Sequence, residues 1–341
     1  MNSSSKLKVV CLGGGNGLST LLSGLKHLSI HSPFRVQGRK LTLNHITGIV
    51  TVSDDGGSSG RIRRQYKTPA PGDIRNCLLA LASNQTLMSQ LFSYRFSGGG
   101  ELSDHSLGNL LLTALADITG DFHQAIQLSS HILAVEGQIL PSTTENVTLQ
   151  ARMTDGSIVT GETRIRESKK TIQEISLDPP DCKPLPEALE ALRLADLIVV
   201  GPGSLYTSLL PNLLVQELQN ALVESSAVRI YVGNLMTEAG ETDHFSASQH
   251  LEALMSHCGG KRLFHAALFN SQLIPEDMIE RYRNEGAEPV AVDESAIREL
   301  DITPYLYPLL SLQTKARHDP VRLAEAIVEI FKMEKNHVAT G

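Results

Sequence analysis

Apolar runs that enter glycine clusters and lead into helical spacing recur along the chain. Residues 8–12 are apolar and reach a glycine cluster, after which leucines recur over residues 18–25 at the spacing of one helix face. Residues 45–52 alternate and are rich in Ile, Val and Thr, which predicts a second strand. Residues 73–135 carry Leu-rich helical patterns, and they predict a helical layer beside the sheet.

From residue 195 onward, strand-like and helix-like segments alternate. The predicted strands are residues 197–200, 228–232, 263–268 and 290–292, and the predicted helices are residues 205–224, 247–255, 275–283 and one that Pro320 opens at its first position. Such alternation is typical of a parallel sheet with helices on both faces. The sequence therefore predicts an α/β fold with a Rossmann-like, doubly wound, mostly parallel sheet.

The pattern changes in the middle of the chain. Residues 147–152 and 158–165 alternate like strands, and Asp155 and Gly156 between them favour a hairpin turn. We therefore expect an inserted β hairpin or subdomain at residues 143–178. In this organisation, residues 1–142 and 179–334 together form one Rossmann-like nucleotide-binding domain, and residues 335–341 form a flexible tail.

Composition narrows the classes of partner. Lys and Arg number 30 against 37 Asp and Glu, and the net charge of −7 argues against nucleic acid as a partner. No apolar run approaches the length of a membrane-spanning helix, and the four cysteines are far apart without metal-like spacing. We therefore expect a cytoplasmic protein with free thiols and no membrane span. Its aliphatic composition leaves room for a homodimer interface.

The first candidate site is the glycine cluster between the first strand and its helix. The free backbone N–H groups of a helix N-terminus favour a phosphate there. The binding candidates are Gly13, Gly14, Gly15, Asn16, Gly17 and Thr20. Their spacing departs from a strict GxGxxG, so the alternative is that the glycines only permit a tight turn.

The second candidate follows the second strand, at the end of the sheet where ligands lie in open α/β folds. Asp54 and Asp55 could hold Mg²⁺ or accept hydrogen bonds from sugar hydroxyls. The residues that could cradle a phosphate behind them are Gly56, Gly57, Ser58, Gly60 and Arg61. A solvated acidic turn is the alternative interpretation.

Polar residues also precede two predicted helices. Asp73 is placed to cap a helix, whereas capping does not explain the adjacent ligand candidates Arg75 and Asn76. His105 precedes a very apolar helix that begins with the further candidate Asn109. A lone histidine is either an acid or base or an ordinary hydrogen-bonding side chain. The catalytic candidates, should a reaction be catalysed, are Asp54, Asp55 and His105.

A second combination of strand, glycine turn and helix occurs near residue 200. Its binding candidates are Gly201, Pro202, Gly203, Ser204, Thr207 and Ser208. Two such turns in one chain suggest a ligand with more than one anchoring point, such as a nucleotide diphosphate compound. Asn234 follows a further strand and could bind a ribose or a base, or serve only in a turn.

Taken in order, these motifs resemble the YvcK-like, or gluconeogenesis factor, family, which is related to the 2-phospho-L-lactate transferases called CofD. The series runs from GGGNG at Gly13 through SDDGGSSGR at Ser53, PGDIRNCL at Pro71, HSLGNLLL at His105, GPGSLYTS at Gly201 and GNLMTEAGET at Gly233 to HDPVRLA at His318. The resemblance implies a Rossmann-like cytoplasmic protein that binds UDP-sugars. It also implies a link to gluconeogenic growth, cell shape and envelope synthesis, with a protein partner in envelope regulation.

The related transferases imply an alternative function. They move a phospholactyl group from a guanosine diphosphate-linked donor to a deazaflavin, with Mg²⁺ near acidic residues, so this resemblance makes Asp54 or Asp55 the metal candidate. Residues 61–71 match no deazaflavin-binding segment, which favours the nucleotide-sugar binder. An NAD-type dinucleotide binder ranks last, because the acidic pair follows the glycine cluster by far more than the roughly 20 residues of the usual fingerprint.

Overall fold

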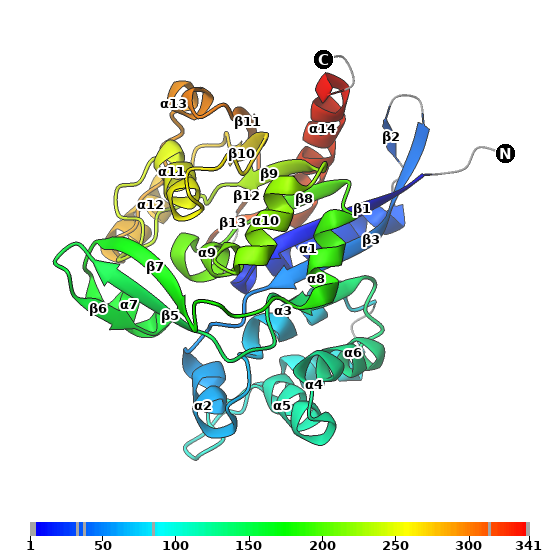
Figure 1. Ribbon diagram of the computed structural model, residues 1–341, viewed down its shortest axis with the longest axis vertical. Helices are drawn as coiled ribbons and strands as arrows, with labels where there is room; N and C mark the ends of the chain where they lie inside the picture. Colours follow the sequence, from blue (N-terminus) through cyan, green and yellow to red (C-terminus); the bar gives the residue numbers. More distant parts are fainter. Residues whose placement is uncertain (1–4, 32–33, 37–38, 84–85, 313–314, 339–341) are drawn as a thin grey trace.

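A mostly parallel sheet forms the centre of the molecule (Figure 1). The computed structural model describes residues 5–31, 34–36, 39–83, 86–312 and 315–338. Within these residues the sheet consists of β1 (Ser5–Gly13), β2 (Phe34–Val36), β3 (Arg39–Val50), β4 (Gln138–Pro141), β8 (Leu197–Val200), β9 (Val228–Val232), β10 (Ala266–Asn270) and β11 (Thr303–Tyr307). Every neighbouring pair is parallel except β2 with β3. The predicted fold class is confirmed.

The order of the strands creates a single point where the winding reverses. Their order is β11-β10-β9-β8-β1-β3, with both β4 and β2 paired to the far edge of β3. The chain therefore moves outward from β1 through β3 to β4, and then returns to β8 on the other side of β1. In open α/β sheets, ligands bind at the carboxyl ends of the strands at such a switch point. The loops after β1 and β8 flank it.

Helices cover both faces of the sheet. On one face α1 (Gly15–His31) packs between α3 (Gly72–Leu81) and α14 (Pro320–Val338), and on the other α8 (Pro186–Arg193) packs against α10 (Gln216–Glu224) (Figure 1). The remaining helices are α2 (Gly57–Tyr66), α4 (Leu87–Ser93), α5 (Leu107–Thr119), α6 (Phe122–Ile132), α9 (Leu210–Leu213), α11 (Ala247–His257), α12 (Glu276–Asn284) and α13 (Glu294–Glu299). No helix in the described part of the chain is long and apolar enough to cross a bilayer.

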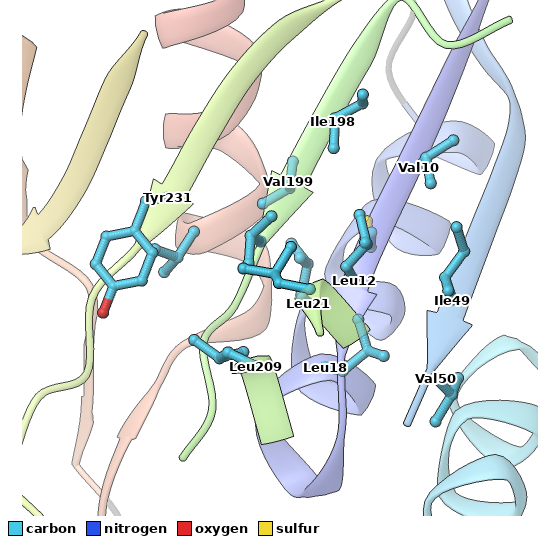
Figure 2. Close-up of a cluster of buried hydrophobic side chains, with 14 of the residues drawn as sticks. Val10, Leu12, Leu18, Leu21, Ile49, Val50, Ile198, Val199, Leu209 and Tyr231 are labelled. Atoms are coloured by element: carbon cyan, nitrogen blue, oxygen red, sulfur yellow. The ribbon is translucent and has the colours of Figure 1, made fainter. Parts of the chain in front are cut away.

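The core lies on both faces of the central strands. All residues of β8 and β9 are buried, as is typical of parallel strands covered on both sides. Figure 2 shows Leu18 and Leu21 of α1 packed toward Leu12 of β1, so the predicted helical spacing of leucines is confirmed. Burial of apolar surface contributes about 25 cal/mol per Å² to the folding free energy. This core therefore holds the strands, and with them the strand ends from which the loops begin, in fixed positions.

The inserted segment folds as a small antiparallel sheet with one helix. It contains β5 (Thr148–Met153), β6 (Ile158–Thr160), β7 (Ile172–Asp178) and the helix α7 (Glu162–Ser168). The predicted hairpin is confirmed, but the strand predicted over residues 158–165 is wrong beyond Thr160. Gly161, with φ +97°, ends β6, and the distant Asp55 carboxylate accepts a hydrogen bond from the first turn of α7. Because Asp55 lies 108 positions before Thr163, the sequence around α7 carries no sign of this contact.

Other boundaries also differ from the predictions. Residues 290–292 are not a strand, since this segment is held by single contacts to the loop after β9, and β11 takes the edge of the sheet instead. The helix predicted over 205–224 is divided: a π-helical turn at Leu205–Leu209 continues into α9, where Pro211 stands in the first turn and needs no helical N–H, and the extended Val215 separates α9 from α10. α14 reaches Val338, so part of the predicted tail is helical, and residues 339–341 lie outside the described residues.

Candidate functional site

A cavity of about 430 Å³ lies at the switch point between β1 and β8. The loop after β1 and the loop after β8 form two of its walls, and they touch one another. A Cβ atom at Gly17 would lie 2.2 Å from the Pro202 carbonyl oxygen, so only glycine permits this approach. Asn212 Nδ2 also donates to the Gly13 carbonyl at 3.1 Å. The two glycine turns found in the sequence thus meet in one place.

The loop after β9 holds the second glycine turn in position. Asn234 Oδ1 accepts from the Gly203 N–H at 3.1 Å, and its Nδ2 donates to the Gly203 carbonyl at 3.0 Å. Ser204 Oγ donates to Glu238 Oε2 at 2.6 Å. Asn234 lines the cavity, but its amide is committed to the neighbouring loop. It therefore acts first as a positioning residue.

Carboxylates gather at the cavity from the loop after β3, the first turn of α3 and the first turn of α7. Asp54, Asp73 and Glu162 all line the cavity. Burial and the nearby Asp54 charge raise the pKa of Asp73 to about 6, although the Gly15 N–H and Arg75 oppose this shift. Burial, together with the charges of Asp54 and Asp73, raises the pKa of Glu162 well above its usual range. Asp73 does not cap α3 as expected, because Pro71 is the N-cap residue and the Asp73 carboxylate faces Gly15.

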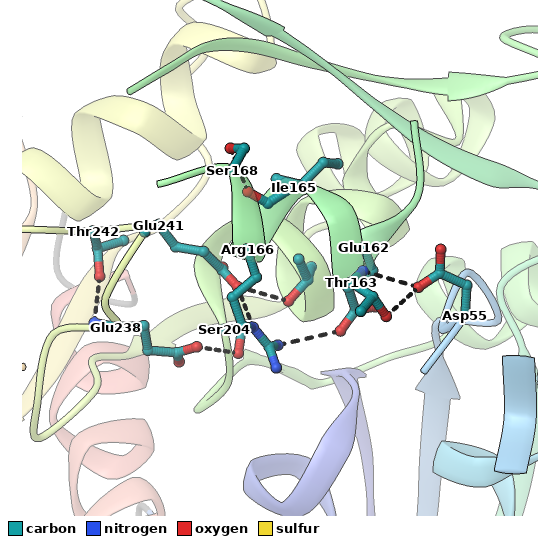
Figure 3. A network of polar contacts seen from close by, with 12 residues as sticks. Asp55, Glu162, Thr163, Ile165, Arg166, Ser168, Ser204, Glu238, Glu241 and Thr242 are labelled. Carbon is teal, nitrogen blue, oxygen red and sulfur yellow. Dashed lines mark hydrogen bonds and ion pairs between the residues drawn. The ribbon is translucent and has the colours of Figure 1, made fainter. Parts of the chain in front are cut away.

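The inserted subdomain closes another wall through α7. Figure 3 shows Asp55 at one end of this contact, where its Oδ1 accepts from Thr163 N at 2.9 Å and from Thr163 Oγ1 at 2.8 Å. At the other end, Arg166 lies 3.4 Å from Glu162 and 3.5 Å from Glu241. The Glu241 side chain is fully buried, and burial together with the charge of Glu238 raises its pKa. Residues after β3 and β9 therefore both hold α7 at the cavity.

The segment before α14 supplies the remaining wall. Arg317 and His318 line the cavity together with Tyr282 of α12. His318 is buried, and burial lowers its pKa to about 4, so it is neutral at physiological pH. Arg166 and Arg317 are then the cationic side chains among the lining residues.

The structure brings about half of the predicted site residues to this cavity. Those that line it are Gly14, Gly15, Asn16, Gly17, Thr20, Asp54, Asp73, Pro202, Gly203, Ser204, Ser208 and Asn234. Those that do not are Gly13, Asp55, Gly56, Gly57, Ser58, Gly60, Arg61, Arg75, Asn76, His105, Asn109, Gly201 and Thr207. The second group includes a separate hydrogen-bonded cluster in which His105 Nδ1 lies 3.0 Å from Ser58 Oγ, and Asn109 Nδ2 donates to the same oxygen at 3.2 Å.

The sequence patterns missed several cavity residues. Glu162 and Arg166 escaped notice because their segment resembles a strand, although their spacing of four residues fits an ion pair on a helix. Glu238 lies in the quoted GNLMTEAGET motif but was not singled out, whereas Tyr282 and Arg317 belong to no quoted motif, and only the fold brings the three together.

The predicted magnesium ligands are separated by their contacts. Asp54 lines the cavity, while its Oδ1 also accepts from the Gly56 N–H at 2.8 Å. The Asp55 carboxylate is engaged by Thr163 of α7. Within the described residues, no group of three or more His, Cys, Asp and Glu side chains is arranged to hold a metal ion. Any cation here would therefore depend on water or ligand oxygens as well.

Comparison with known proteins places this architecture in a family. The family model described as 2-phospho-L-lactate transferase CofD matches residues 9–310. The chain belongs to the CofD family. A gluconeogenesis factor of Halalkalibacterium halodurans is 46% identical over 325 residues, covering 95% of this chain and 96% of that protein. The gluconeogenesis factor of Bacillus subtilis is 42% identical, covering 96% of this chain and 99% of the relative.

A crystal structure in the same family has the same fold. It is that of a UPF0052 family member from Bacillus halodurans, with a TM-score of 0.88 and 46% identity, covering 96% of this chain and all of that one. The residues matched by the CofD family model include both glycine turns and α7. Arg317 and His318 lie just beyond them, so one wall of the cavity comes from outside the matched span.

Proposed function

We propose that this CofD-family protein is a regulatory factor that binds a nucleotide sugar, namely a UDP-sugar. The observation that carries the proposal is the meeting of two glycine turns at one cavity on the switch point of the sheet. A helix N-terminus favours a phosphate group, and the first turn of α1 contains no acidic residue of its own, although the Asp73 carboxylate faces it. A cavity of about 430 Å³ also falls within the usual size range of small-molecule sites.

The other walls suit the remaining parts of such a ligand. Thr237 and Glu238 offer groups that can bind sugar hydroxyls, while Arg166 and Arg317 supply positive charge for the diphosphate. Relatives named gluconeogenesis factors support a link between this protein and gluconeogenic growth. We further propose that the bound state signals to a protein partner in envelope synthesis and cell shape.

Calorimetric titration with UDP-GlcNAc, UDP-glucose, GDP and NAD, each with and without Mg²⁺, tests this function. Saturable binding of a UDP-sugar without turnover is the expected result. Absence of any UDP-sugar binding would contradict the proposal, and a preference for GDP that appears only with Mg²⁺ would favour the transferase alternative. Preference for NAD would point to a dinucleotide site instead.

Replacing Arg166 by alanine is expected to weaken UDP-GlcNAc binding about 10-fold, because a charge-assisted contact to phosphate contributes about 1.5 kcal/mol. Arg164→Ala is the matched control, since Arg164 is an exposed arginine of the same helix that does not line the cavity. Both variants are measured by calorimetry at one ionic strength. Equal losses in the two variants would assign the effect to the general charge of α7 rather than to a contact in the cavity.

A CofD-like transferase is the second candidate, and the paired carboxylates at the glycine loop favour it. Burial and the charge of Asp54 together raise the pKa of Asp73, and the repulsion between the two carboxylates suits a cation. Mg²⁺ is commonly held by one or two carboxylates with water and phosphate oxygens completing its shell, so Asp54 and Asp73 fit this ion. When bound, the ion would neutralise charge that develops on the transferred phosphorus group.

Asp54→Asn tests the transferase directly. If the protein catalyses transfer, this change is expected to reduce Mg²⁺-dependent release of nucleoside monophosphate by 100-fold or more, because one charged metal ligand is lost. Asp104→Asn serves as the control, since Asp104 is an exposed aspartate outside the cavity. Turnover that survives Asp54→Asn unchanged would exclude Asp54 as a metal ligand.

A further inference from the structure

The first turns of three helices converge beside the cavity, around predicted residues that do not line it. Ser58 in the first turn of α2 contacts both His105 and Asn109 at the start of α5. Gly72 at the start of α3 packs on the same turn of α2, where a Cβ atom would lie 2.5 Å from Ser59 Oγ. These helices contain 10, 10 and 13 residues, so the helix dipole places partial positive charge at each N-terminus.

None of the three helices has a side-chain cap. Their N-cap residues are Gly56, Pro71 and Ser106, and the Ser106 hydroxyl donates instead to the Phe92 carbonyl. The first turns of α2 and α5 also contain no acidic residue. Since the first amides of a helix have no partner within it, three sets of N–H donors and three positive dipole ends meet here, and only α3 has an acidic residue, Asp73, in its first turn.

Arginines add further positive charge at the same place. Arg61 donates to the Ser103 carbonyl at 2.7 Å, and Arg95 donates to the Asp104 carbonyl at 2.5 Å. The Arg75 side chain extends from the first turn of α3 to the first turn of α5. It packs so closely on Gly108 that a Cβ atom added there would lie 2.8 Å from Arg75 Cδ. Within the described residues, none of these three arginines forms an ion pair within 4 Å.

The Arg75 side chain provides the most direct sign of a missing ligand. Arg75 is 9% exposed, and its Nε is a buried donor without a hydrogen-bond partner, although its Nη2 donates to Asn76 Oδ1. Buried polar atoms are nearly always satisfied, and a buried charged donor is costly to leave alone. The negative charge of Asp73 is felt by Arg75, but the Asp73 carboxylate faces the cavity and the Gly15 N–H. It therefore does not pair with Arg75 Nε.

We propose that Ser58, Arg61, Arg75, Arg95 and His105, here called the arginine cluster, form a second site that binds a phosphate group. Its ligand is inorganic phosphate or a phosphate monoester. The first turn of α3 separates it from the cavity, because Asp73 faces the cavity whereas Arg75 turns toward α5. The site goes beyond the proposed function and does not rest on it, since nucleotide-sugar binding involves other residues.

Titration with inorganic phosphate, against chloride at equal ionic strength, tests the site in the full-length protein. The His105 ring is followed by NMR and assigned through His105→Gln. Burial and the charges of Arg61 and Arg95 lower the pKa of His105 in the free protein, so the negative charge of a bound phosphate is expected to raise it. Phosphate is also expected to leave the affinity for UDP-GlcNAc unchanged. A parallel titration with glycerol phosphate distinguishes a free anion from a monoester as ligand.

Matched arginine variants make the test specific. Arg95→Ala, at an exposed position, is expected to weaken phosphate binding about 10-fold, and Arg75→Met, which keeps much of the side-chain volume, should abolish it. Arg64→Ala is the control, because Arg64 is exposed in the last turn of α2 rather than the first. The proposal is overturned if phosphate shifts His105 no more than chloride does. It is equally overturned if Arg64→Ala weakens binding as much as Arg95→Ala, or if phosphate competes with UDP-GlcNAc.

Discussion

Replacing Gly17 by alanine is expected to reduce nucleotide-sugar affinity by at least about 100-fold, equivalent to about 2.7 kcal/mol of binding free energy. The added methyl group would meet the Pro202 carbonyl oxygen at 2.2 Å and the Gly203 nitrogen at 3.2 Å. Both neighbours are backbone atoms, so neither can rotate away. The two glycine turns must separate, and the walls that they form at the cavity are then displaced.

Gly24→Ala is the matched control for this change. Gly24 lies in the same helix, and a methyl group there would meet the Pro320 carbonyl oxygen of α14 at 1.9 Å. Overpacking of this kind costs about 1–3 kcal/mol of unfolding free energy, so both variants should unfold at lower temperature. Thermal unfolding and calorimetry together separate stability from binding. If Gly24→Ala loses the ligand as well, the effect comes from general destabilisation or from displacement of the Arg317 wall beside Pro320, and the contact between the two loops is not specifically required.

The regular part of the fold was predictable from local signals. Strands buried on both faces produce continuous apolar runs, and the leucine spacing of α1 gives a clear helical period, so β1, α1 and β8 were found. The errors occur where distant residues decide the structure. The helix α7 depends on a carboxylate 108 positions away, and β11 completes the sheet through pairing with β10 that no local pattern encodes.

The candidate site divides in the same way. Glycine turns at strand ends are readable because the turn, the strand and the helix are adjacent in sequence, and these residues do line the cavity. The sequence did not predict that neighbouring residues of the acidic motif and of the arginine-containing motif would lie at different sites. Asp54 lines the cavity whereas Asp55 contacts α7, and Asp73 and Arg75 of one turn point to different places. Residues one or two positions apart diverge because a tight turn and a helix direct neighbouring side chains differently.

The unfolding free energy is expected to fall as pH rises from about 4 to 7. An aspartate in an unfolded chain has a pKa of about 3.9, whereas that of Asp73 in the folded protein is raised to about 6. Between these values the folded state binds more protons than the unfolded state, so raising the pH favours unfolding. The resulting loss is about 3 kcal/mol for Asp73 alone, at 1.4 kcal/mol per pKa unit. The raised pKa of Glu241 extends the window upward.

Urea unfolding of the protein and of Asp73→Asn across this pH range measures the effect. Asp73→Asn should be more stable than the parent at pH 8 and show a smaller pH dependence, because the buried charge is gone. Asp277→Asn, which removes an exposed carboxylate from α12, should leave the pH dependence unchanged. If both variants lost the pH dependence of the unfolding free energy equally, Asp73 would not be its cause. If Asp54 and Asp73 hold Mg²⁺, the ion should stabilise the protein more at pH 8 than at pH 5, because only the ionised pair binds it.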